Sequence, residues 1–318
     1  MTAPPGKIVI PVAGLGTRML PATKSVSKEL LAVGNRPVFH YIAAEAAAAG
    51  ATELILVAAT RSPAALYYLR RDQALENYLA ERGNEGALAA VRAIPCRQTK
   101  ISVVVQKRPL GLGDAVLRAR EAVGDSPFGV MLPDVLLHPP EQGMPRLAAH
   151  FARSGGSAVL AHEVAAGEVR HYGIVDCGGA VPEAGGSCRL QGVVEKPAPE
   201  RAPSRLAVTG RYVFTPAIFD TLRATAPGAG GEVQLSDAIH ALAGKEPVHV
   251  LAHRAACYDC GGKPGLFRAH MEFALRDPEF GAAARDCILD LARGLERGLE
   301  RGRRDGPRDG PKRRPEEK

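Results

Sequence analysis

The chain has 318 residues, of which 46% are apolar and 24% are charged. This composition is typical of a globular protein and excludes a disordered or fibrous chain. No window of about 18 consecutive apolar residues occurs, and no apolar stretch precedes residue 8, so we expect neither a membrane span nor secretion. Six scattered cysteines do not form a disulfide framework in a chain of this length. We therefore expect reduced thiols and a cytoplasmic protein.

The formal net charge of +7 is unevenly distributed along the chain. From residue 293 to the end there are ten lysines and arginines against six acids, a balance of +4 that leaves +3 for the first 292 residues. The body is therefore only mildly basic, and no nucleic-acid-binding motif accompanies it. We expect no nucleic-acid partner.

The first element is a strand that leads into a glycine-rich loop. The apolar run Ile8–Val12 predicts a buried strand. Gly14 and Gly16 let backbone N–H groups approach a ligand, and successive amides of such a turn form a concavity for anions. Arg18 and Lys28 add positive charge, which suits a polyphosphate. The loop matches neither the dinucleotide fingerprint nor the Walker motif. It predicts a cradle for a nucleoside triphosphate, and the alternative is an ordinary turn with solvated basic residues.

Strands and helices alternate through the first half of the chain. The predicted helices are 37–50, 62–82 and 112–123, and the predicted strands are 54–58, 101–105 and 128–132. This alternation predicts an α/β fold with a doubly wound, mostly parallel sheet of the Rossmann-like kind and helices on both faces. In such sheets ligands bind beyond the carboxyl ends of the strands. The glycine-rich loop lies at such an end.

Two polar motifs follow strands of this half. Gln106 comes directly after the strand 101–105, and its amide can donate and accept hydrogen bonds as the edge of a pyrimidine base requires. Gly111 then lets the backbone approach a flat ring. Asp134 follows the strand 128–132, where a carboxylate can hold Mg²⁺ on bound phosphates. On the residues alone, a polar loop that opens a helix and a helix cap are the alternatives for these two motifs.

Beyond about residue 140 the pattern changes to shorter strands with glycine-rich connections. The predicted strands are 157–164, 173–175, 190–194 and 208–214. Glu195 could accept hydrogen bonds from sugar hydroxyls and Lys196 could neutralise a phosphate, although such a pair is also common at a solvated strand end. Glu232 lies near the start of a helix, where capping is an equal explanation for an acid.

A C-x-x-C pair, Cys257 and Cys260, occurs late in the chain. Tetrahedral zinc needs a further ligand pair, and the other cysteines offer no second close pair. A redox dithiol normally begins a helix, whereas this pair follows a strand. We therefore expect neither zinc nor dithiol chemistry from this motif.

The end of the chain is a charged repeat rich in glycine and proline. Its composition cannot bury enough apolar surface to offset the entropy of ordering it. We expect residues 293–318 to form a frayed helix that passes into a disordered, low-complexity tail.

Several of these motifs together resemble one family. The segment Gly14–Lys28 resembles the signature of the sugar-1-phosphate nucleotidyltransferases, G-x-G-T-R-[ML]-x-P-x-T-x-x-x-x-K, and is most similar to its bacterial UTP–glucose-1-phosphate uridylyltransferase version. The motifs G-V-V-E-K-P at Gly192–Pro197 and D-C-G-x-K at Asp259–Lys263 follow in the family's order. The resemblance covers residues 6 to 276. It implies one nucleotidyltransferase domain over 1–292, with a nucleotide-binding half over about 1–140 and a smaller β-rich sugar-binding part over about 141–292.

The resemblance also implies a reaction. It is the transfer of the uridylyl group of UTP to α-D-glucose 1-phosphate, giving UDP-glucose and pyrophosphate, with Mg²⁺ as cofactor and a homo-oligomer (dimer or tetramer) as the assembly. The same chemistry on another nucleotide or sugar 1-phosphate, such as dTTP, and a non-catalytic regulator that binds nucleotide sugars are the alternatives.

The site residues that the resemblance implies fall into four groups. The catalytic cations are Arg18, Lys28 and Lys196. The nucleotide-binding residues are Ala13, Gly14, Gly16, Thr17, Gln106 and Gly111. The sugar-binding residues are Gly173, Glu195, Lys196 and Glu232. The metal ligands are Asp134 and Asp259. The chain departs from residues that are frequent in the family at Ser27, Ala32, Leu110, Asp114, Gly262 and Pro264.

Overall fold

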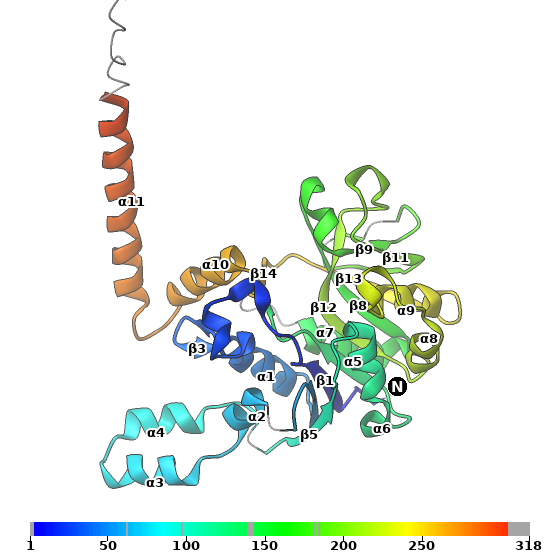
Figure 1. Ribbon diagram of the computed structural model, residues 1–318, viewed down its shortest axis with the longest axis horizontal. Coiled ribbons are helices and arrows are strands. Elements are labelled where there is room, and N and C mark those ends of the chain that lie inside the picture. The colour runs from blue at the N-terminus through cyan, green and yellow to red at the C-terminus, as the bar shows by residue number, and fades with distance from the viewer. Residues whose placement is uncertain are drawn as a thin grey trace, which may run out of the picture.

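The computed structural model describes residues 3–304 apart from 62, 97, 139–142, 181 and 184. Within these residues, ten strands form one central sheet (Figure 1). Its main path has the order β10-β13-β8-β12-β6-β1-β4-β5, and β9 joins this path at β12 and pairs with β11. The strands are β1 (Lys7–Pro11), β4 (Glu53–Ala58), β5 (Lys100–Val105), β6 (Phe128–Met131), β8 (Ser157–Glu163), β9 (Gly173–Asp176), β10 (Ser187–Arg189), β11 (Gly192–Glu195), β12 (Leu206–Phe214) and β13 (Val248–His253).

The sheet has a parallel half and a mixed half. Strand β1 is parallel to β4 and β6, and β4 is parallel to β5. Strand β12 runs antiparallel to β6 and β8 and so joins this half to the rest, in which β8 and β13 are again parallel. The predicted doubly wound α/β sheet is confirmed. The carboxyl ends of β1, β4, β5 and β6 meet at one edge, and the glycine-rich loop after β1 lies there.

Helices cover both faces of the sheet (Figure 1). On one face Ile8 and Leu54 belong to a buried cluster with residues of α1 (Val38–Ala48) and α7 (Gly143–Ser154). On the other face Val9 and Ile55 belong to a cluster with α5 (Leu112–Arg118), α8 (Ile218–Ala224) and α9 (Leu235–Ala243). Successive strand residues point to opposite faces and both are buried, which explains why these strands are continuously apolar in sequence.

The remaining elements extend the edges of this core. They are α2 (Ala64–Leu69), α3 (Gln73–Glu81), α4 (Glu85–Arg92), α6 (Arg120–Val123), α10 (Lys263–Ala274), α11 (Gly281–Arg304), the antiparallel pair β2 (Ala32–Val33) and β3 (Arg36–Pro37), and the antiparallel pair β7 (Val135–Leu137) and β14 (Cys257–Asp259). None of the described helices is both long enough and apolar enough to span a membrane. The cytoplasmic location stays a prediction.

Helix α11 extends away from the body of the molecule (Figure 1). It continues to Arg304, so a regular helix reaches into the segment 293–318 that we expected to fray and become disordered. Residues 305–318 lie outside the described residues.

A buried ion pair connects the central sheet to a helix. Arg211 on β12 is fully buried, and its guanidinium donates to both carboxylate oxygens of Glu45 on α1, with Nη2 and Oε2 2.8 Å apart. The same Nη2 donates to the carbonyl oxygen of Val135 at 2.8 Å. Arg211 therefore fixes the backbone beside Asp134.

Candidate active site

The loop after β1 folds back on itself through three short 3₁₀ turns. Gly16 has a φ of +64°, and a Cβ atom there would lie 3.1 Å from the side chain of Thr23. Glycine is required here because other residues rarely adopt this left-handed conformation and the approach is close. The Thr23 hydroxyl donates to the Gly16 carbonyl oxygen at 2.8 Å. The fold of the loop brings Lys28 next to Gly14, where a Cβ atom would be 3.5 Å from the Lys28 ammonium.

Two carboxylates meet this loop. Asp134 follows β6, and Asp259 ends β14, whose antiparallel pairing with β7 puts Asp259 opposite Val135. Lys28 Nζ donates to Asp134 Oδ2 at 2.5 Å, and Arg18 Nη1 donates to Asp259 Oδ2 at 3.2 Å. The strand pairing therefore brings together residues that are more than a hundred positions apart in sequence.

Gly261 marks the point at which these groups converge. A Cβ atom there would lie 2.7 Å from Asp134 Oδ2, 2.8 Å from Arg18 Nη2 and 3.0 Å from Asp259 Oδ1. Its backbone N–H donates to Asp259 Oδ1 at 2.9 Å. Two anionic and two cationic side chains thus share a small volume, an arrangement that suits a metal ion and a polyphosphate.

A cavity of about 450 Å³ opens beside these groups. We call it the active-site cavity. It is lined by Arg18, Leu132, Asp134, Val135, His162, His171, Tyr172, Lys196, Val208, Thr209, Gly210, Cys257 and Asp259. Both halves of the chain contribute to it, and Lys196 faces the same space as Arg18 and the two carboxylates.

The predicted sugar-binding residues Gly173 and Glu195 lie together behind Lys196. A Cβ atom at Gly173 would be 3.2 Å from Glu195 Oε2, and the Ser236 hydroxyl donates to that oxygen at 2.5 Å. The Lys196 ammonium is 3.3 Å from Glu195 Oε1. Lys196 has a φ of +46°, a conformation that costs a non-glycine residue about 1–2 kcal/mol. Such strain is often retained at functional sites.

The predicted base-binding residues form a second cluster that does not line this cavity. Gln106 is buried, and its Nε2 donates to Asp114 Oδ2 at 2.8 Å and to the Gly111 carbonyl at 3.2 Å. Gly111 has a φ of +97°, and a Cβ atom there would lie 2.9 Å from Glu232 Cβ. The structure therefore brings Gln106, Gly111 and Glu232 together. It adds Asp114, whose carboxylate orients the Gln106 amide and which sequence reasoning treated only as a departure from the family.

Comparison with known proteins places this geometry in a family. The family model described as nucleotidyl transferase matches residues 7–275. The chain belongs to the nucleotidyl transferase family. The UTP–glucose-1-phosphate uridylyltransferase of Haemophilus influenzae is 42% identical to it over 294 residues, which cover 91% of this chain and 100% of the relative.

Two solved structures are similar over almost their whole length. A UTP-bound UGPase from Acinetobacter baumannii is 36% identical with a TM-score of 0.83, covering 90% of this chain and 99% of that one. A UDP-glucose pyrophosphorylase complexed with UDP-glucose is 32% identical with a TM-score of 0.75, covering 86% and 100%. The family and the fold predicted for this nucleotidyl transferase from its sequence are confirmed.

Glu29 is a feature of the nucleotidyl transferase loop that the sequence analysis missed. It is only 2% exposed, and neither its Oε2 nor the buried Ser27 hydroxyl has a hydrogen-bond partner among the described residues. Burial raises the pKa of Glu29, and the adjacent Lys28 ammonium opposes that shift. An acid inside a run of basic residues is the signal that could have identified it.

Two histidines lie at or near the ends of neighbouring strands, His162 on β8 and His253 at the end of β13, and His162 lines the active-site cavity. Burial lowers the pKa of His162, and burial together with the neighbouring His162 lowers the pKa of His253 to about 3. Both imidazoles are therefore neutral at neutral pH.

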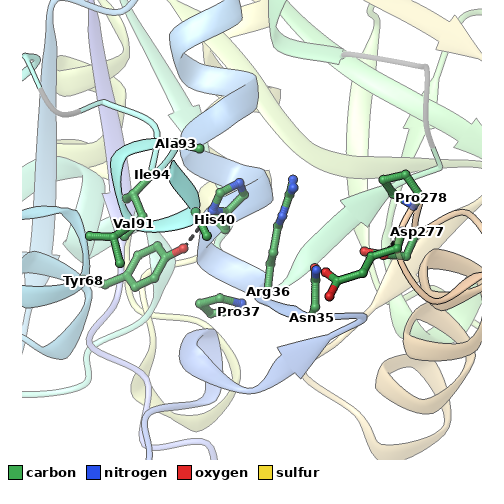
Figure 2. A pocket seen from close by; sticks show the side chains of 12 residues that line it. Asn35, Arg36, Pro37, His40, Tyr68, Val91, Ala93, Ile94, Asp277 and Pro278 are labelled. Atoms are coloured by element: carbon green, nitrogen blue, oxygen red, sulfur yellow. Dashed lines mark hydrogen bonds between the residues drawn. The ribbon is translucent and has the colours of Figure 1, made fainter. Parts of the chain in front are cut away.

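A second cavity of about 390 Å³ lies elsewhere, between α1, α4 and the segment after α10 (Figure 2). His40 Nδ1 and the Tyr68 hydroxyl are 2.7 Å apart on its wall, and Arg36 projects into it. Burial, followed by the charge of Arg36, lowers the pKa of His40 to about 4. None of the residues predicted for substrate or metal binding lines it, so the active-site cavity is the candidate for catalysis.

Proposed function

We propose that this nucleotidyl transferase is an enzyme that transfers the uridylyl group of UTP to α-D-glucose 1-phosphate and forms UDP-glucose and pyrophosphate. The observation that carries the proposal is the convergence of Asp134, Asp259, Arg18 and Lys28 around Gly261. The substrates are those in the names of the relatives, a UTP–glucose-1-phosphate uridylyltransferase and a UTP-bound UGPase.

The reaction is an in-line displacement at the α-phosphorus. An oxygen of the sugar phosphate forms the new P–O bond, and the bond to the pyrophosphate oxygen breaks. Such a reaction needs positioning and neutralisation of charge more than acid–base groups. A preorganised cation that contacts a developing negative charge lowers the activation free energy far more in a cavity that excludes water than it would in water.

Lys28 and Arg18 are assigned to the triphosphate. Each is paired with a carboxylate in the structure, Lys28 with Asp134 and Arg18 with Asp259. In the complex these cations would contact triphosphate oxygens and stabilise the leaving pyrophosphate. Lys196, on the other side of the cavity, would hold the phosphate of the sugar.

Asp134 and Asp259 would hold Mg²⁺. Their carboxylate oxygens lie within 3.0 Å of one point, and an all-oxygen donor set with few carboxylates fits Mg²⁺, which takes its other ligands from phosphates and water. When bound, the cation supplies charge neutralisation on the phosphates.

Gln106 and Glu195 are assigned to recognition of the two substrates. The Gln106 Nε2 is already bound to Asp114 and Gly111, so the amide oxygen is the atom that would accept from the uracil base, and Ala13, Gly14, Gly16 and Thr17 would contribute backbone contacts to the nucleotide. Glu195, beside Gly173, would accept from sugar hydroxyls, as would Glu232, which lies beside Gly111.

A substrate panel tests the proposal. Pyrophosphate release should be measured with UTP, dTTP, ATP and GTP, each paired with the 1-phosphates of glucose, galactose and glucosamine. We expect the highest kcat/KM for UTP with glucose 1-phosphate. Preference for another pair would overturn the substrate assignment, and no release with any pair would overturn the enzymatic one.

A further inference from the structure

Three side chains of types that bind metals, which the proposed reaction does not use, cluster beside the active-site cavity, and two of them, His162 and Cys257, line it. They are His162, His253 and Cys257, and one ligand atom of each lies within 4.8 Å of the others. His162 and His253 are direct partners in the register of the parallel strands β8 and β13, so both imidazoles emerge at the same edge of the sheet. Cys257 is the first residue of β14, and the turn between β13 and β14 brings its side chain into contact with His253.

The spacing of this cluster approaches that of a tetrahedral site. His253 Nε2 and Cys257 Sγ are 3.5 Å apart, and two such ligands on one tetrahedral zinc ion are also about 3.5 Å apart, given Zn–N and Zn–S bonds of about 2.0 and 2.3 Å. Thr209 Oγ1 lies 3.1 Å from His253 Nε2 and 3.3 Å from His162 Nδ1. The ligand atom of His162 lies within 4.8 Å of the other two ligand atoms.

The donor atoms select a different cation from the one expected at the carboxylates. Imidazole nitrogen and thiolate sulfur favour Zn²⁺, Co²⁺ and related transition metals, whereas Mg²⁺ favours oxygen. The expectation that the C-x-x-C motif binds no zinc rested on cysteine pairs alone. The fold places two histidines that are 91 positions apart in sequence beside one of the two cysteines, Cys257.

We propose that His162, His253 and Cys257 form a binding site for a zinc-class divalent cation, with the fourth ligand position open to the active-site cavity. The cation binds as the Cys257 thiol releases its proton, so the thiolate offsets half of the added charge. Nearby positive charge limits the affinity of the site: Arg146 and Arg211 both act on His253, although Arg211 is paired with Glu45.

Cobalt titration tests this binding without any catalytic readout. The metal-free full chain is titrated with Co²⁺ under reducing conditions and without Mg²⁺. We expect one equivalent to give the near-ultraviolet thiolate-to-cobalt band and the visible bands of tetrahedral Co²⁺, and Zn²⁺ to displace them. Absence of a thiolate band in the wild-type protein would overturn the proposal.

Variants then assign the ligands. Cys257→Ser should abolish the thiolate band. His162→Gln and His253→Gln should each weaken Co²⁺ binding by at least about 10-fold, because loss of even a residue that only hydrogen-bonds to a metal ligand lowers metal affinity by about that much. Cys287→Ser, at an exposed cysteine of α11, is the matched control and should leave the spectrum unchanged. His253 is buried, so if His253→Gln fails to fold, Cys257→Ser and His162→Gln carry the test. A band that survives Cys257→Ser would place the metal elsewhere.

A second readout rests on the proposed function. His162 and Cys257 line the same cavity as Lys196 and Asp259, so bound Zn²⁺ should inhibit pyrophosphate release at saturating Mg²⁺. In Cys257→Ser the Zn²⁺ concentration needed for half-inhibition should rise by at least about 10-fold, in line with the loss of zinc affinity. If Zn²⁺ inhibited the wild type and Cys257→Ser equally, the inhibition would not come from zinc bound at this site. The cobalt titration tests metal binding without a substrate, so its result would remain valid even if no substrate pair reacted.

Discussion

Gly261 determines how closely the two carboxylates and the two cations of the site can approach. Its missing side chain leaves the space in which Asp134, Asp259 and Arg18 come together, and any β-carbon would touch all three. Sequence reasoning named the four charged residues but gave no role to this glycine, because the contact depends on three segments that meet only in the fold.

We predict that Gly261→Ala lowers turnover by about 10²-fold, the effect expected when reacting groups shift by about 1 Å. The methyl group would lie 2.7 Å from Asp134 Oδ2 and would displace it. The neighbouring Gly262→Ala is the control, because its nearest contacts would be at 3.9 Å. Steady-state kinetics of both variants decide the matter. Equal activity of the two variants would show that the spacing of the carboxylates is not critical.

Glu29 gives a prediction about pH. Its pKa in the folded protein is raised by burial, so the folded state favours the protonated form. The stability that this contributes is fully present below the unfolded pKa, about 4.3, and is lost as the pH rises through the folded pKa. Glu29→Gln should therefore melt at a higher temperature than the wild type at neutral pH, with the difference vanishing near pH 4.

Thermal melts from about pH 4 to 8 measure this difference, with pH 4 lying near the unfolded pKa of a glutamate. Glu81→Gln, at an exposed position of α3, serves as the control and should show no such pH dependence. A variant less stable than the wild type at neutral pH would mean that the buried carboxylate is stabilising in its ionised form.

At the scale of elements, the pairing of β7 with β14 and the buried Arg211–Glu45 pair hold the site. Strand β12 carries Arg211, α1 carries Glu45, and the guanidinium also binds the carbonyl of Val135 beside Asp134. One buried pair thus connects the core of the sheet to the position of a proposed metal ligand.

We predict that Glu45→Gln destabilises the protein by about 3–5 kcal/mol, because it leaves the guanidinium buried without a compensating charge. The matched control is Glu163→Gln, whose partner Arg205 is exposed, and it should cost less than about 1 kcal/mol. Denaturant unfolding of both variants measures the two values. Similar losses of unfolding free energy in the two variants would mean that burial of the Arg211–Glu45 pair does not increase its contribution to stability.

Predictions from sequence succeeded where the pattern of apolar residues was strong. They failed where a local backbone conformation or a side-chain cap ends a helix. The strands β4, β5 and β6 were predicted to within one residue at each end because their sequences are continuous apolar runs, and in β4 and β6 both faces are buried. The helix predicted over 62–82 is in fact two helices, since Arg70 is extended and the Asp72 side chain caps α3 at the N–H of Leu75. Helix α4 has no buried residue, so no pattern revealed it.

The same limit applies to the site. Lys28 and Asp134 could be identified from the sequence because Lys28 belongs to the signature of the glycine-rich loop and Asp134 follows a predicted strand. Asp114 and the histidines of the zinc-class site could not, since their roles come from a side-chain contact or from the register of distant strands.

At the scale of the whole molecule, one sheet carries both of the predicted substrate-binding parts. Strand β12 joins the parallel half to the mixed half, and the active-site cavity lies where their residues meet. The boundary near residue 140 stays a prediction, as does the homo-oligomer. Helix α11 stands apart from this body (Figure 1).

We predict that deletion of residues 294–318 leaves the melting temperature and the activity nearly unchanged, because none of the described residues of this segment belongs to a buried cluster. Scanning calorimetry and kinetics of the truncated chain measure both quantities. Size-exclusion chromatography belongs to the same experiment, since Leu291 and Leu295 are exposed on α11. A large loss of stability would show that the segment docks on the body or on another copy.

The two carboxylates provide the most direct test of the account as a whole. UDP-glucose formed from UTP, glucose 1-phosphate and Mg²⁺ should be quantified by chromatography for the wild type, Asp134→Asn and Asp259→Asn. We predict that each variant keeps its fold by circular dichroism and loses at least about 10²-fold in turnover, as expected when a group that positions transition-state charge is removed. Formation of UDP-glucose at a near wild-type rate by either variant would contradict the assignment of this site.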